Sequence, residues 1–200
     1  MKRQEIKFIF DSFLKVNPCL SRLSMIADHP PRWVHSIYFD TKEGFLYHQS
    51  QEGIVPRKKI RLRWYNNENF LCQGVWEEKW SFEHYREKKS QSYFYDAPKS
   101  VQDILRLSPD QLLIPTAMVS YRRTYFKNAK GIRSTWDQNI VYQGINRKLE
   151  INHQKSLEHL SVFEIKTPHD MSKDESTSVV GHPSSRFSKY CRAIEALRVF

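Results

Sequence analysis

Charged and apolar residues alternate along seven segments of the chain, with the period of a β-strand that buries one of its faces. In residues 57–65, RKKIRLRWY, cations occupy every odd position through Arg63, and the even positions are mostly apolar. The same alternation recurs in QEIKF (4–8), VWEEKW (75–80), HYREKK (84–89), SYRRTYF (120–126), GIRSTWDQ (131–138) and SVFEIKT (161–167). The pattern therefore predicts a sheet with one charged face and one apolar face.

The charged face is dominated by cations, with roughly ten of them against four carboxylates when one face is counted per segment. Cations two positions apart on a strand lie about 7 Å from each other and repel unless an anion lies across them. Two geometries fit: a sandwich that shows its charges to water, or a closed barrel that turns them inward around a polyanion. Arginine favours the second, because its planar fork binds phosphate with two hydrogen bonds.

The remaining pattern completes an α+β chain. Strands are expected at 4–10, 34–40, 57–65, 70–80, 82–95, 117–127, 131–142 and 160–167, and turns at 66–69 and 129–131. Helices are expected at 11–27, 98–113 and 187–198, the last one capped by Ser184 or Ser185. Residues 168–186 are polar without a usable period and are expected to form a mobile loop. The length of 200 residues favours one domain, 1–200.

Composition narrows the class of partner. Hydrophobic residues make up 40% of the chain, which excludes global disorder. The formal net charge is +10, which points to a polyanionic partner. No apolar run of about 18 residues and no signal-peptide core is present. Cys19, Cys72 and Cys191 are widely spaced, which is typical of a reducing compartment, so a cytoplasmic protein is expected. Direct nucleic-acid binding is not expected, because the aromatic residues alternate away from the cations.

Eight short motifs together resemble the VTC domain, the polyphosphate polymerase domain of the triphosphate tunnel metalloenzyme superfamily. They are, in the family's order, QEIKF, SIYFDT, RKKIRLRWY, WEEKW, YRRTYF, RSTWD, FEIK and SKY. The resemblance implies an antiparallel eight-stranded β tunnel with a polar, basic lumen, flanked by helices at both ends and one in mid-chain.

The resemblance also implies a set of site residues. Catalytic roles would belong to Lys79, Arg123, Arg133 and Lys189. Phosphate or nucleotide would be bound by Lys7, Lys59, Arg61, Arg63, Lys88, Lys166, Arg186 and Ser188, of which Lys59 and Lys88 are assigned on strand parity alone. Glu164 would hold Mn²⁺ or Mg²⁺; its alternative role is a structural ion pair with Lys166.

The implied function is a metal-dependent phosphotransferase that moves the γ-phosphate of ATP onto a polyphosphate chain. A non-catalytic polyphosphate- or nucleotide-binding module and a hydrolase of triphosphates or RNA 5′ ends remain open alternatives. Only Glu5 and Lys7 stand where another branch of the superfamily has an ExExK signature, which disfavours a triphosphatase of that branch. A membrane-protein partner is compatible with these expectations.

Overall fold

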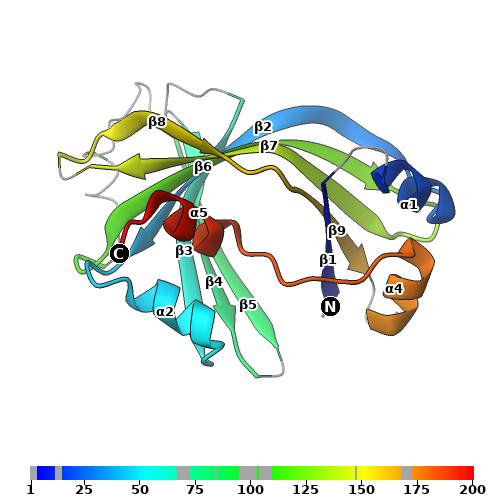
Figure 1. Cartoon of the computed structure of the whole chain (residues 1–200), viewed down its shortest axis with the longest axis horizontal. Coiled ribbons are helices and arrows are strands. Elements are labelled where there is room, and N and C mark those ends of the chain that lie inside the picture. Colours follow the sequence, from blue (N-terminus) through cyan, green and yellow to red (C-terminus); the bar gives the residue numbers. More distant parts are fainter. Residues whose placement is uncertain are drawn as a thin grey trace. The chain divides into compact units, whose positions relative to one another are not determined.

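The computed structural model describes residues 4–11, 15–66, 73–83, 85–94, 103, 110–146, 148–167 and 173–200. The chain forms mostly antiparallel β-sheet with a few short helices (Figure 1). The strands are β1 (Gln4–Phe10), β2 (Ile26–Asp40), β3 (Arg57–Tyr65), β4 (Gln73–Ser81), β5 (Arg86–Phe94), β6 (Ile114–Lys127), β7 (Arg133–Ile145), β8 (Ile151–Leu157) and β9 (Ser161–Thr167). The helices are α1 (Val16–Arg22), α2 (Phe45–Glu52), α4 (Lys173–Val180) and α5 (Lys189–Leu197).

The hydrogen-bonded strand order is β1-β9-β7-β6-β2-β3-β4-β5, with β8 paired to β7. The order has β1 at one end and β5 at the other, and no pairing between described strands joins these two ends. Closure into the expected barrel therefore stays a proposal. No helix within the described residues is long and apolar enough to cross a membrane.

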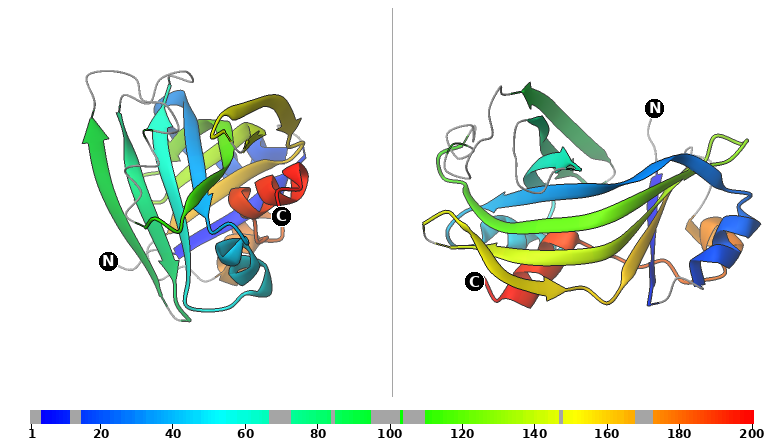
Figure 2. Two further views of the ribbon diagram at one scale, coloured as in Figure 1. Left: turned by 90° about the vertical axis from the view of Figure 1, so that its left-hand side faces the viewer. Right: turned by 90° about the horizontal axis from the view of Figure 1, so that it is seen from above.

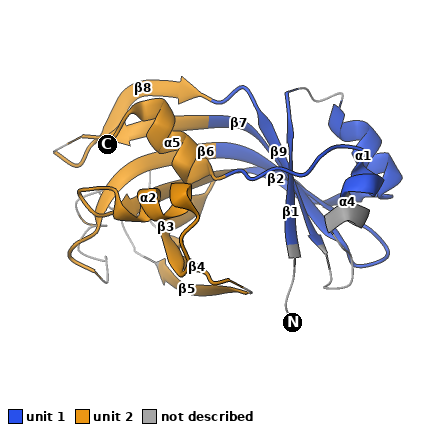
Figure 3. Cartoon of the chain, turned by 60° about the horizontal axis from the view of Figure 1, so that its bottom comes forward, with its two compact units in different colours: residues 1–32, 121–140, 158–187 blue, residues 33–120, 141–157, 188–200 orange. Residues whose placement is uncertain are grey.

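The chain divides into two compact units, coloured separately in Figure 3. Unit 1 comprises residues 1–32, 121–140 and 158–187, and unit 2 comprises 33–120, 141–157 and 188–200. The strands β2, β6 and β7 each contribute one part to either unit. The expectation of a single domain for 1–200 stays a prediction.

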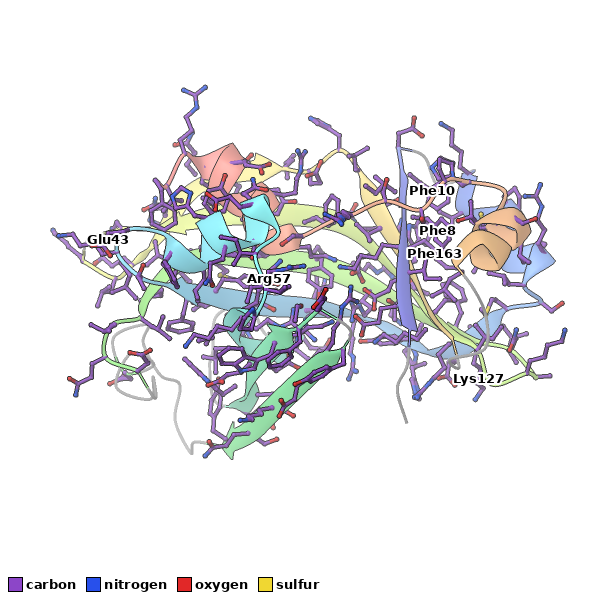
Figure 4. The ribbon with its side chains drawn as sticks, turned by 90° about the horizontal axis from the view of Figure 1, so that it is seen from below. Phe8, Phe10, Glu43, Arg57, Lys127 and Phe163 are labelled. Atoms are coloured by element: carbon purple, nitrogen blue, oxygen red, sulfur yellow. The ribbon has the colours of Figure 1, made fainter. Side chains whose placement is uncertain are left out.

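Unit 1 buries the apolar face of its strands under α1 and α4. Ile6, Phe8 and Phe163 are at most 6% exposed and pack with Val16 and Val180 of these two helices. Phe8, Phe10 and Phe163 lie together beside β1 in the stick view (Figure 4). The side chains between them, at positions 5, 7, 164 and 166, form the polar face, as the alternation predicted.

Unit 2 is built in the same way around a second apolar cluster. Ile37 and Phe39 of β2, Ile60 and Leu62 of β3 and Leu46 of α2 are at most 2% exposed and contact one another. Helices α2 and α5 belong to this unit and lie side by side, as the left view of Figure 2 shows. In both units, strands with one apolar and one polar face bury the apolar face and so form the core.

The structure corrects several expected elements. The N-terminal helix is shorter than 11–27 and spans Val16–Arg22, and β2 begins already at Ile26. Helix α4 lies inside 168–186, where a loop was expected, and the final helix is capped by Ser188 rather than by Ser184 or Ser185. Helix α2 and strand β8 were not expected at all. Most of the expected helix at 98–113 lies outside the described residues.

Candidate functional site

The polar face of unit 2 consists of cross-strand rows on β2 to β5. One row aligns Tyr38, Arg61, Glu77 and Ser90, since each is the register partner of the next. The neighbouring row aligns Lys59, Lys79 and Lys88 across β3, β4 and β5. Directly opposite side chains have Cβ atoms about 4.5–5.5 Å apart, and like charges in such positions destabilise a sheet. An anion between these lysines would remove that cost.

Glu77 compensates the arginines of this face. Its Oε2 lies 2.5 Å from Arg61 Nη2 and 3.6 Å from Arg63 Nη1, and Lys88 Nζ contacts its Oε1. The Glu77 side chain is only 6% exposed. Burial alone would raise its pKa, but the charges of Arg61 and Arg63 and the bond from Lys88 lower the pKa of Glu77 to about 2. Glu77 is therefore ionised at every physiological pH.

Helix α5 presents its N-terminus to the same unit. Ser188 is its N-cap residue, and Ser188 Oγ accepts hydrogen bonds from Cys191 N at 3.3 Å and from Lys59 Nζ at 2.7 Å. Burial lowers the pKa of Lys59. Lys59 and Ser188 therefore meet at the start of α5, and Lys189 is the first residue of that helix. Backbone N–H groups at a helix start also favour anions.

In unit 1, the polar face is formed by β1, β9 and β7. Lys7, Glu164 and Thr135 are register partners, and so are Glu5, Lys166 and Arg133 in the next row. Lys7 Nζ donates to the carbonyl oxygen of Phe187 at 2.8 Å, so this expected phosphate ligand also fixes the segment before α5. The structure thus places four of the expected residues, Lys7, Glu164, Lys166 and Arg133, in two neighbouring rows of this sheet.

Arg123 is engaged by a carboxylate in the same unit. Its Nε and Nη2 donate to Asp137 Oδ1 and Oδ2 at 2.6 and 2.7 Å, and its guanidinium lies 5.2 Å from the centre of the Tyr121 ring. Burial lowers the pKa of Arg123, but the charge of Asp137 outweighs it and raises the pKa well above its ordinary value. Asp137 itself is 1% exposed.

Two expected residues of unit 1 are more open to solvent. Arg133 lies on β7 and Arg186 lies between α4 and α5, and both are exposed. The positions of Arg61 and Arg63 in unit 2 and of Arg123 and Arg133 in unit 1 agree with strand parity in each unit. Whether all four guanidinium groups face one shared cavity stays a prediction.

Glu164, the expected metal ligand, lies beside a lysine on the polar face of unit 1. Its side chain is 13% exposed, with Lys166 Nζ 3.6 Å from its Oε1. Among the described residues, no three His, Cys, Asp or Glu side chains are grouped closely enough to hold a metal. Mg²⁺ is commonly bound by one or two carboxylates together with substrate phosphates and waters, and one accessible carboxylate beside basic side chains suits that arrangement.

The motif analysis missed the buried groups that support these cations. Arg61 Nη1 donates to Tyr38 Oη at 3.1 Å, and Asp40 lies fully buried at the end of β2, the strand that carries Tyr38. Tyr38 and Asp40 belong to the motif SIYFDT, which the sequence analysis used only for the family resemblance. Glu77 and Asp137 were placed on the charged faces, but their roles as counter-ions depend on pairing between strands, which the sequence alone does not reveal.

Comparison with known proteins gives the family. The family model described as "VTC domain" matches residues 2–106 and 81–198, so the chain belongs to the VTC domain family. No curated protein sequence matches the chain.

Several solved structures superpose on this chain over nearly its whole length. A putative adenylyl cyclase from Hippeastrum, described as having a dominant triphosphatase activity, superposes with a TM-score of 0.57 at 14% identity, covering 98% of this chain and 96% of that one. A putative adenylate cyclase from Vibrio parahaemolyticus gives 0.55 at 11% identity, covering 98% and 99%. A Pyrococcus horikoshii protein gives 0.55 at 12% identity, covering 98% of each chain. At these identities the similarities concern the fold alone, which this chain shares with the two adenylate cyclase-like structures and the Pyrococcus protein.

Proposed function

We propose that the protein is a polyphosphate polymerase-like phosphotransferase that transfers the γ-phosphate of ATP to a polyphosphate chain. The observation that carries this proposal is the row of Lys59, Lys79 and Lys88, which stands beside Arg61 and the α5 N-terminus on one face. Glu77 contacts Lys88 and Ser188 accepts a hydrogen bond from Lys59, so the repulsion is partly offset in the ligand-free protein. A chain of phosphates would offset the repulsion that remains among these cations. Membership of the VTC domain family supports the same substrate class.

The chemistry requires positioning and charge neutralisation more than a covalent nucleophile. A terminal oxygen of the polyphosphate acceptor attacks the γ-phosphorus of ATP, the bond to the bridging oxygen breaks, and ADP leaves. The attacking oxygen is already anionic, so no general base is needed. Lys79, Lys189, Arg123 and Arg133 are the proposed catalytic cations. Closure of the sheet into an eight-stranded tunnel is part of this proposal.

Glu164 is the proposed metal ligand. A divalent ion held by Glu164 would supply positive charge that neutralises the phosphate groups of the substrate. Lys7 and Lys166, its neighbours on the same face, would bind phosphate oxygens of the same ligand, and Arg186 would do so at the more exposed side.

A triphosphate hydrolase is the second candidate. The specific observation in its favour is the description of the Hippeastrum structure, whose protein has a dominant triphosphatase activity. In that reaction water replaces the polyphosphate acceptor, and the same cations stabilise the transferred phosphoryl group. A non-catalytic binding module would use the same faces without turnover.

One assay separates these candidates. Purified protein is incubated with ATP and Mn²⁺ or Mg²⁺, and polyphosphate and free phosphate are each measured. Polyphosphate formation is expected; free phosphate alone would indicate the hydrolase, and binding of ATP without any product would indicate the binding module.

The metal role has its own test in the Glu164→Gln variant. This variant is expected to fold normally and to need a higher Mn²⁺ concentration for half-maximal activity, because the amide lacks the charge that holds the ion. Lys166→Gln serves as the matched control, since it breaks the Glu164–Lys166 pair without removing the carboxylate. Equal metal dependence of wild type and Glu164→Gln would assign Glu164 to the ion pair instead.

A further inference from the structure

Two motif residues without an assigned role meet in the core of unit 2. Asp40 is the aspartate of SIYFDT and Tyr190 is the tyrosine of SKY, and Tyr190 Oη donates a hydrogen bond to Asp40 Oδ2. Asp40 is 0% exposed and Tyr190 is 2% exposed. A buried carboxylate and a buried phenol so far apart in sequence form a specific link between β2 and helix α5.

Asp40 also caps helix α2. Its Oδ1 accepts from Leu46 N at 2.8 Å and its Oδ2 from Tyr47 N at 2.9 Å, while the neighbouring Thr41 Oγ1 accepts from Phe45 N at 3.1 Å. The first three amides of the helix are therefore satisfied by the Asp–Thr pair of the motif, although Gly44, the N-cap residue, offers no side chain. The N-terminus of α2 in turn stabilises the buried negative charge.

Tyr190 connects this capped end to the basic face. It follows Ser188 and Lys189 directly in the first turn of α5, so holding Tyr190 fixes this turn, in which Ser188 accepts the hydrogen bond from Lys59. Its ring stacks on Tyr38 with centroids 5.2 Å apart, and Tyr38 Oη accepts the hydrogen bond from Arg61. Burial and the charge of Asp40 both raise the pKa of Tyr190, so its hydroxyl keeps the proton that it donates.

We propose that Asp40 and Tyr190 are positioning residues that hold the N-terminus of helix α5, with Ser188 and Lys189, in register with the phosphate-binding cations of β3. They act through Ser188, Lys189, Tyr38 and Arg61 and touch no substrate atom themselves. This inference rests on the proposed function for the part that concerns phosphate, but the link itself is a property of the ligand-free protein.

The test is the Tyr190→Phe variant, which keeps the ring and its stacking on Tyr38 but removes the hydroxyl. Tyr47→Phe is the matched control, because Tyr47 contacts the Tyr190 ring from α2 and its hydroxyl accepts a hydrogen bond from the exposed Gln51 rather than donating to Asp40. Binding of inorganic tripolyphosphate is measured by calorimetry. Tyr190→Phe is expected to weaken the affinity about tenfold, the effect of losing one hydrogen bond to a charged group. Tyr47→Phe is expected to leave it unchanged.

A double-mutant cycle with Lys189→Ala shows whether the effect travels through α5. In the Lys189→Ala background the loss caused by Tyr190→Phe is expected to shrink to about twofold, because the group that Tyr190 positions is gone. A structural role alone would lower the melting temperature of Tyr190→Phe and leave the affinity and the cycle unaffected, which would overturn the proposal.

Amide hydrogen exchange tests the link without any ligand. Tyr190→Phe is expected to speed exchange at residues 189–192 and 45–47 at least tenfold more than Tyr47→Phe does, because both helix starts depend on Asp40 and Tyr190. Unchanged exchange there would refute the positioning role. If wild type fails to bind tripolyphosphate while the exchange effect is present, the proposed function falls and the link between Asp40 and Tyr190 stands.

Discussion

At the scale of single residues, buried carboxylates control how the cations of this protein are held. Glu77 contacts Arg61, Arg63 and Lys88, and Asp137 contacts Arg123, each within one unit. Each carboxylate fixes guanidinium groups that would otherwise repel their neighbours. The ligand-free faces are therefore partly neutralised, and less strained than the sequence alone predicted.

Glu77 gives a stability change with a defined pH range. Its pKa is lowered from 4.5 to about 2 in the folded protein, so its contribution is present above pH 4.5 and is lost as the pH falls through 2. That difference corresponds to about 3 kcal/mol of unfolding free energy at neutral pH. Glu77→Gln is expected to be less stable by this order at pH 7 and to lose less stability on acidification.

Chemical denaturation between pH 2 and pH 7 measures this difference. The free energies of unfolding of wild type and Glu77→Gln should converge as the pH approaches 2. Parallel curves across the whole range would show that Glu77 does not carry the ionised, paired role described here.

Asp137 offers a second residue-scale prediction, on the cost of an uncompensated buried charge. Asp137→Asn leaves Arg123 buried without its carboxylate and is expected to lower the free energy of unfolding by about 3–5 kcal/mol. Lys15→Ala is the control, because its partner Asp11 is 62% exposed and a solvent-exposed ion pair contributes little to stability. Urea denaturation of both variants decides, and equal small losses would contradict the buried-pair interpretation.

At the scale of elements, the join between α2 and α5 depends on a glycine. Gly44 has φ +72°, and a Cβ on it would lie 2.6 Å from the ring of Phe200 beyond the end of α5. Gly53, at the other end of α2, has φ +76° with nothing within 4 Å. Gly53→Ala is expected to cost about 1 kcal/mol from backbone strain alone, and Gly44→Ala more, because Phe200 must also move.

The comparison of the two alanine variants isolates the contact with Phe200. Thermal melting should show the excess cost of Gly44→Ala in wild type and its disappearance when Phe200→Ala is also present. An excess that persists without the Phe200 ring would place its origin elsewhere in the α2 start.

Strand periodicity predicted the observed bounds of β3, because cations and apolar residues alternate from Lys59 to Trp64, and it placed β1 and β9 within a residue. Helix α2 was missed for a physical reason: its caps are Asp40 and Thr41, several residues upstream of Phe45, so no capping residue directly precedes it. Strand β8 was missed because most of its residues face solvent and carry no apolar alternation.

For the candidate site, parity and motifs could predict which residues share one face of a strand, and the roles of those residues stay a prediction. Lys59, assigned on parity alone, does lie beside Ser188 at 2.7 Å. Parity could not supply the contacts between elements. Pairing of β3 with β4 decides that Arg61 meets Glu77, and docking of α5 decides that Tyr190 meets Asp40. These contacts depend on register and on helix docking, which the sequence does not reveal by its period.

At the scale of the whole molecule, the net charge of +10 and the two basic faces predict a large effect of polyanions on stability. Binding to the folded state adds RT ln(1 + [L]/Kd), about 2.7 kcal/mol at a hundredfold excess over Kd. For a chain of this size that is a rise of about 5–10 °C in melting temperature. Tripolyphosphate is expected to produce it, and sulfate much less, because sulfate cannot span several cations at once.

Salt separates enclosed cations from exposed ones. Charges in water are screened over about 8–10 Å at physiological ionic strength, so a patch on an outer surface would lose its effect at 0.3 M salt. Cations such as Lys59 and Arg63 are largely withdrawn from solvent, and the stabilisation by tripolyphosphate should survive this salt concentration. Melting curves with tripolyphosphate, ATP and sulfate at low and at 0.3 M salt make the comparison. A shift that salt abolishes, or that sulfate matches, would favour an exposed basic surface over an inward-facing phosphate tunnel.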